Sequence, residues 1–223
     1  MTPGRWAALR VSLAPQNVAP QRASLPLVSL RRMLFSMTSL SDNTSAPHAS
    51  DATTQAGMDA FEAFFWRYER DILGYLWRLT GDEQMARDLS QETFLRAWQR
   101  FDTLQRYDQP RAWLFRVASN LGINHLRGRS RSGWLAPITE DTQTLAMHGG
   151  DLVSRLAERD TIRQALLGLP PRQRAAVTLC DVYGFTSAEA AAALGLSHGS
   201  LKMSLWRGRE RFRQEYQRTG GAE

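Results

Sequence analysis

Cysteine, lysine and long apolar runs are all scarce in this sequence of 223 residues. Cys180 is the only cysteine, which excludes an intramolecular disulfide and a thiolate zinc site and suits a reducing compartment. It lies in an apolar stretch, where a free thiol is typically buried and inert. No apolar run approaches the roughly 20 residues of a membrane-spanning helix. We therefore expect a soluble, cytoplasmic protein without membrane insertion.

The patterns of an enzyme are also missing. The four histidines are scattered without metal-ligand spacing, and no glycine-rich phosphate loop or nucleophile motif is present. Catalytic residues, metal ligands and cofactors are therefore not expected. The excess of basic over acidic residues gives a clearer indication of function. The formal charge is +6, and Lys202 is the only lysine. Arginine, which suits phosphates and base edges, supplies the remaining cations, and a nucleic-acid partner is indicated.

Residues 1–57 differ in composition from the rest of the chain. They are rich in Pro, Ser, Ala and Thr, have poor apolar periodicity, and contain no acid before Asp42. Three interpretations compete: a disordered extension, a start assigned too early with initiation at Met33, Met37 or Met58, and a targeting segment. We take residues 1–57 as a disordered extension and assign it no function.

Helical periodicity begins near Met58 and no segment shows sustained alternation, so the sequence predicts an all-α fold. Apolar residues recur at intervals of three and four over 61–79. A capping box at Thr80 and Glu83 would start a second helix, and a third would run over 111–127. Residues 129–151 are rich in Gly, Ser, Thr and charge and predict a flexible linker. The prediction is two small helical domains, 58–128 and 152–219, joined by that linker.

The second domain contains a helix-turn-helix pattern at 186–209. Thr186 and Glu189 form a capping box, Gly195 allows a sharp turn, and Ser197 is a suitable N-cap for the last helix. In this motif the second helix enters the major groove of DNA. Lys202 and its neighbours would reach base edges, whereas Arg207 and Arg209 would contact phosphates. The structural alternative is a helical hairpin with solvated arginines.

The first domain has an acid-free basic segment at 111–131. Trp113 and Phe115 lie among its arginines, and Tyr107 precedes it. Basic groups for the backbone and aromatic rings for base stacking are typical of single-strand binding surfaces. At helical spacing these two rings cannot face the same way, so we expect at least one of them in the core.

Four segments, 88–98, 111–127, 167–174 and 199–209, together resemble the extracytoplasmic-function sigma factors of the sigma-70 superfamily. The likeness covers roughly residues 59–217, with the segments in the same order. It implies a sigma-2-like domain at 58–128 and a sigma-4-like domain at 152–219. It also implies three partners: the clamp and flap of core RNA polymerase, promoter DNA and an anti-sigma factor.

The resemblance further implies three groups of site residues, with a loop at 102–110 that would hold a flipped minus-10 base. The polymerase-binding residues are Asp88, Gln91, Glu92 and Arg96. The minus-10 residues are Trp113, Arg116, Asn120 and Arg127. The minus-35 residues are Ser200, Lys202, Met203, Trp206, Arg207 and Arg209.

Four positions depart from the usual pattern of this family. Arg87 stands where an acid is common and Ser90 where an apolar residue is common. Gly122 weakens its helix by up to about 1 kcal/mol relative to alanine, and Gly208 replaces a usual alanine. The function predicted is a sigma factor that directs promoter-specific initiation. The alternative is a stand-alone helix-turn-helix repressor or activator, which would bind as a dimer.

Overall fold

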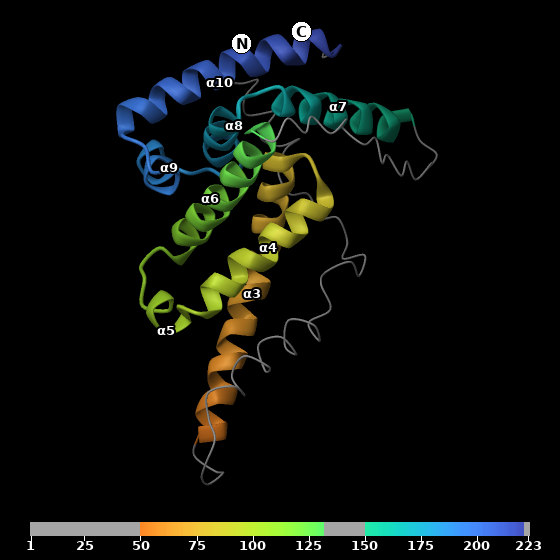
Figure 1. Ribbon diagram of the computed structural model, residues 1–223. Helices are drawn as coiled ribbons and strands as arrows, with labels where there is room; N and C mark the ends of the chain where they lie inside the picture. Colours follow the sequence, from red (N-terminus) through yellow and green to blue (C-terminus); the bar gives the residue numbers. More distant parts are fainter. Residues whose placement is uncertain (1–49, 132–149, 221–223) are drawn as a thin grey trace. The chain divides into compact units, whose positions relative to one another are not determined.

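A computed structural model describes residues 50–131 and 150–220 (Figure 1). All regular elements of these residues are helical, which confirms the predicted all-α class. The sequence placed the first helix at Met58, but α3 runs over Ser50–Thr80 and so begins inside the predicted extension. Residues 1–49 and most of the predicted linker lie outside the described part. The chain divides into two compact units at Phe65, and the predicted site residues all belong to the unit that contains Phe65 to Glu223.

The N-terminal helices of this unit pack around a core of aromatic rings. These helices are the later turns of α3, α4 at Glu83–Trp98, the short α5 at Phe101–Leu104 and α6 at Pro110–Arg131. Phe65 of α3 meets Phe94 of α4 edge to face, with ring centroids 4.7 Å apart. Tyr75 of α3 packs on Phe115 of α6 at 5.2 Å, and its hydroxyl lies 2.7 Å from that of Ser119. Apolar burial and these ring contacts hold α3, α4 and α6 together.

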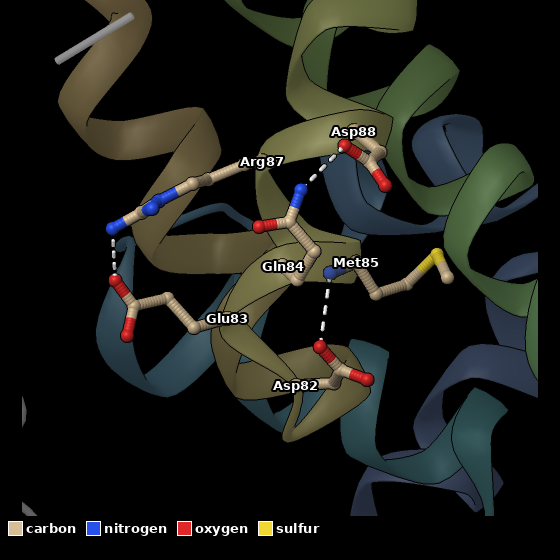
Figure 2. Close-up of polar contacts among 6 residues, drawn as sticks. All are labelled: Asp82, Glu83, Gln84, Met85, Arg87 and Asp88. Carbon is tan, nitrogen blue, oxygen red and sulfur yellow. Dashed lines mark hydrogen bonds and ion pairs between the residues drawn. The ribbon is translucent and has the colours of Figure 1, made fainter. Parts of the chain in front are cut away.

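The break between α3 and α4 differs from the prediction. Thr80 is the last residue of α3, and its hydroxyl donates to the Leu76 carbonyl at 2.8 Å. Asp82 is the N-cap of α4 instead, and its carboxylate accepts from the Met85 amide at 2.9 Å (Figure 2). The predicted capping box was therefore wrong. Gly81 adopts a positive φ of 77°, which ends α3 early enough for Asp82 to cap the next helix.

The C-terminal helices begin with α7 at Gly150–Leu167 and α8 at Pro171–Val177, which starts on a proline. A π-helical turn, η1 at Thr178–Val182, continues α8. Two further helices, α9 at Ser187–Leu194 and α10 at His198–Arg218, complete the domain. Leu201, Leu205 and Phe212 bury one face of α10.

The two predicted domains contact each other within this unit. Arg111 of α6 donates to the Tyr183 carbonyl at 2.7 Å, and its guanidinium lies 4.5 Å from the centroid of the Phe185 ring. Arg174 of α8 donates to the Leu79 carbonyl at 2.6 Å. These contacts were not predicted, because they join residues far apart in the sequence.

Candidate nucleic-acid interface

The helix-turn-helix is built by the caps that the sequence predicted. The Thr186 hydroxyl accepts from the Glu189 amide at 3.3 Å, and the Glu189 carboxylate accepts from the Thr186 amide at 2.8 Å. Hydrogen bonds from Thr186 hold the pKa of Glu189 below its usual value. Gly195 takes the left-handed conformation, with φ 61°, at the end of α9. Ser197 then caps α10 by accepting from the Ser200 amide at 3.2 Å. These caps fix the angle between α9 and α10.

The N-terminal half of α10 presents most of the predicted minus-35 residues to solvent. Trp206 is 66% exposed and Met203 is 49% exposed, which is unusual for large apolar side chains. Ser200, Lys202 and Arg207 are also exposed. The opposite face of the helix is buried through Leu201 and Leu205. One face therefore anchors the helix and the other can enter a groove.

Arg209 differs from the other predicted minus-35 residues. Its guanidinium forms a bidentate ion pair with Asp181, at 3.0 Å from Nε to Oδ2 and 2.7 Å from Nη2 to Oδ1. Arg213 pairs with Glu210 at 2.5 Å, and Arg218 with Glu215 at 2.8 Å. Positive charge at the N-terminal half of α10 thus comes mainly from Lys202 and Arg207.

The predicted minus-10 residues follow one side of α6. Arg116, Asn120 and Arg127 are exposed, and Trp113 is half-buried. Their spacing of three, four and seven residues is that of a single helical face. Asn124 is exposed between Asn120 and Arg127, and it was not among the predicted site residues.

Phe115 is fully buried and packs on both Tyr183 and Phe185, which confirms that one of the two α6 rings belongs to the core. The segment before α6 is exposed from residue 105 to residue 109. Tyr107 in this segment is 45% exposed, so its ring is accessible to a base.

The predicted polymerase-binding residues lie on α4. Asp88, Gln91 and Arg96 are exposed and Glu92 is half-buried. Glu92 accepts from Arg96 at 2.8 Å. Asp88 accepts from Gln84 at 3.1 Å, as Figure 2 shows.

Arg87 forms an ion pair with Glu83, one turn earlier in the same helix (Figure 2). The charge of Arg87 is therefore balanced within α4. Asp88 and Glu92 remain the acidic residues of the predicted polymerase-binding surface. Ser90, the other unusual position on α4, is buried.

Within residues 50–131 and 150–220, no group of histidine, cysteine and acidic side chains is arranged to hold a metal ion. No helix of this part of the chain is both long and apolar enough to cross a membrane.

Two buried charged residues, Asp181 and Arg174, were not predicted from the sequence. Only Asp181 had a signal in the sequence, because it is an acid inside an apolar stretch. Asp181 accepts from Arg209 of α10, and Arg174 donates to carbonyls near the ends of α3 and α7.

The described residues form an all-helical protein with a helix-turn-helix, a motif typical of DNA-binding proteins. Residues 64–132 match Sigma-70 region 2, and residues 159–212 match Sigma-70 region 4. The ECF RNA polymerase sigma factor SigL of Mycobacterium tuberculosis is 34% identical over 72% of this chain and 86% of its own length. The chain therefore belongs to the extracytoplasmic-function sigma factor family, as the resemblance indicated.

A longer relative, the ECF RNA polymerase sigma factor SigG of Mycobacterium tuberculosis, is 31% identical over 94% of this chain. The match spans only 61% of the length of SigG. Among solved structures, the sigma factor RpoE of Bartonella quintana, crystallised with the anti-sigma factor NepR, aligns with a TM-score of 0.56. It is 24% identical, and the alignment covers 71% of this chain and 97% of RpoE, which supports the fold.

Proposed function

We propose that this chain is a non-catalytic specificity subunit that directs core RNA polymerase to promoters in the cytoplasm. The observation that carries the proposal is the exposed face of α10, where Trp206 and Met203 stand beside Lys202 and Arg207. A helix cap and a left-handed glycine turn hold this face outward. Such a face suits the major groove of the minus-35 element.

The N-terminal domain would capture strand-separated DNA at the minus-10 element. The exposed side of α6 offers Arg116 and Arg127 for phosphates and Asn120 for a base edge. Trp113 is half-buried, and we expect its exposed part to contribute to stacking. Tyr107 and the segment from 105 to 109 would hold a base that leaves the stack.

Core polymerase would bind α4. Asp88 and Glu92 lie four residues apart and therefore on one face, with Gln91 and Arg96 beside them. Polymerase would then hold both DNA-binding domains on one promoter, so that two weak contacts give one selective engagement.

An anti-sigma factor is the remaining proposed partner. RpoE and NepR, the pair in the similar structure, provide the precedent. We expect the partner of this chain to cover surfaces of both domains and thereby to compete with polymerase or promoter.

Run-off transcription with purified core polymerase tests the proposal. The templates are promoter fragments selected from a random duplex pool by the reconstituted holoenzyme. We expect start-site-specific transcripts that need both the chain and its upstream element. Absence of core binding together with absence of any specific transcript would contradict the proposal. Tight operator binding by a dimer of the chain without polymerase would instead favour the repressor or activator alternative.

A further inference from the structure

We propose that Asp181 is a positioning residue for minus-35 reading, and that Arg209 acts through Asp181 rather than on a DNA phosphate. The inference rests on the proposed function and assigns a structural cause to the orientation of α10. Asp181 is 3% exposed and lies on η1, outside the reading helix. Arg209 lies on α10, one turn beyond the exposed Trp206.

The geometry of the pair restrains rotation as well as distance. Two parallel hydrogen bonds, of 3.0 and 2.7 Å, join Nε and Nη2 of Arg209 to the two oxygens of Asp181. A bidentate pair fixes the relative orientation of its two planes, which a single ammonium contact does not. Because Asp181 is buried, removing Arg209 would take a bidentate partner away from a buried charge, which is costly. The pair therefore has one strongly preferred arrangement.

The Asp181 carboxylate that pairs with α10 lies within the π-helical turn η1. The Tyr183 amide donates to the Thr178 carbonyl at 3.1 Å, which closes a wider turn than an α-helix has. Such turns are rare overall, and those that do occur are often found at functional sites.

A second contact sets how closely α10 approaches α8. A Cβ atom on Gly208 would lie 2.8 Å from Cγ2 of Val177 and 3.3 Å from the Gln173 carbonyl oxygen. Only glycine fits this crossing without a shift of neighbouring atoms. Gly208 thus fixes the depth of α10, and the adjacent Arg209 fixes its rotation.

The rotation matters because Lys202, Trp206 and Arg209 follow one another at four and three residues along the same side of α10. All three line one groove between this helix and the start of α9. A rotation of about 20° displaces a side-chain tip by about 2 Å on a helix of this radius. Donor–acceptor distances in hydrogen bonds vary by only about 0.5 Å, so that displacement would break a hydrogen bond to a base edge.

The competing interpretation is that Arg209 contacts a phosphate. The two interpretations predict opposite effects of Asp181→Asn. If Arg209 binds phosphate, weakening its internal partner leaves promoter affinity unchanged or raises it. If Asp181 positions the helix, the same substitution lowers the ability to distinguish promoter sequences.

The experiment compares reconstituted holoenzymes that contain the full chain with Asp181→Asn, with Arg209→Gln, or with both substitutions. The probes are a promoter fragment selected by the wild-type holoenzyme and the same fragment with its upstream element scrambled. The affinity ratio of the two probes measures discrimination. We expect each single variant to lower this ratio by roughly tenfold, the size of one lost base contact, and the double variant to lower it no further.

The salt dependence separates the two roles of Arg209. Loss of a phosphate contact reduces the slope of log affinity against log salt by about 0.9, whereas loss of a positioning contact leaves the slope unchanged. Arg213→Gln is the matched control, because Arg213 forms its ion pair with Glu210 of its own helix. We expect it to retain discrimination.

Arg209→Lys covers the case in which the other variants fail to fold. The positioning role predicts that it loses discrimination, since one ammonium cannot hold both carboxylate oxygens in a plane. The phosphate role predicts that it keeps discrimination. Unchanged discrimination in both Asp181→Asn and Arg209→Lys would overturn this inference but not the proposed function. A wild-type holoenzyme that selects no upstream element would overturn the proposed function together with it.

Discussion

The Arg174 guanidinium donates to the Leu79 carbonyl at 2.6 Å, and so joins α8 to the end of α3 across 95 residues of sequence. It also donates to the carbonyls of Leu167 and Leu169, at 2.6 and 2.9 Å. All three acceptors lie at or just beyond the ends of helices, where carbonyls lack partners within the helix. Burial lowers the pKa of Arg174 to about 10, so these hydrogen bonds must offset a desolvation cost.

We expect Arg174→Met to lower the free energy of unfolding by about 1–3 kcal/mol, because the methionine leaves buried carbonyls without donors. Urea denaturation followed by circular dichroism measures the change. Arg172→Met is the matched control, since Arg172 is an exposed arginine of the same helix. Equal effects of the two substitutions would show that the buried hydrogen bonds contribute nothing.

Two buried tyrosines predict a loss of stability at alkaline pH. Desolvation is the main cause that raises the pKa of Tyr75, and likewise that of Tyr183, well above the ordinary value of 10.0. The folded state keeps these protons longer than the unfolded state does. Their contribution to stability is therefore complete below about pH 10 and is lost as pH rises toward the folded values.

The test compares urea midpoints at pH 8 and above pH 10. Tyr75→Phe should flatten the alkaline decline, because it removes one ionisable group while its ring still packs on Phe115. At neutral pH it should cost about 1 kcal/mol for the lost hydrogen bond with Ser119. Tyr107→Phe, at an exposed tyrosine, serves as the control. If the stability of Tyr75→Phe declines at alkaline pH as steeply as that of the wild type, the decline comes from groups other than Tyr75.

The parts of this structure that sequence predicted well are local. The caps at Thr186 and Ser197 and the turn at Gly195 depend on residues within a few positions of one another, and each forms as expected. Short-range hydrogen bonds and conformational preferences decide such features. The wrong prediction at Thr80 has the same local origin, since Thr80 and Asp82 are both possible caps and Asp82 became the cap.

The contacts that sequence did not predict join distant residues. Arg209 and Asp181 are 28 positions apart, and Asp181 lies within the π-helical turn. Periodicity offers no sign of such a turn. Gly122 was interpreted as a weak point of its helix, yet a Cβ atom there would lie 2.6 Å from Cδ2 of Leu79. Its role is close packing of α6 on α3, which only a three-dimensional structure reveals.

Two glycines of α6 therefore predict opposite results. Gly122→Ala gains helix propensity but inserts a methyl group against Leu79, and we expect a net destabilisation of about 1–3 kcal/mol. Gly128→Ala has no neighbouring atom within 4 Å of the added Cβ and should stabilise by about 0.5–1 kcal/mol. Urea midpoints of the two variants measure both effects. Stabilisation by Gly122→Ala would mean that Leu79 moves aside at little cost.

The division of labour between α4 and α10 predicts a crossed pattern of defects. Lys202→Ala and Arg207→Ala should each weaken promoter binding and spare core binding, because both side chains are exposed on the reading face of α10. Lys202→Ala should relax sequence preference at one position by about 1–3 kcal/mol, as expected for a lost base contact. Arg207→Ala should weaken all duplexes evenly and reduce the salt slope by about 0.9.

Asp88→Ala and Glu92→Arg should produce the opposite pattern, since their side chains lie on α4. We expect weaker binding to core polymerase, with duplex binding by the free chain unchanged. Arg211→Ala is the control on α10, because this exposed arginine lies one turn beyond the reading half of the helix. Core affinity by fluorescence anisotropy and promoter affinity by filter binding separate the two defects. If substitutions on α4 and α10 impair the same step, these two helices do not act on separate partners.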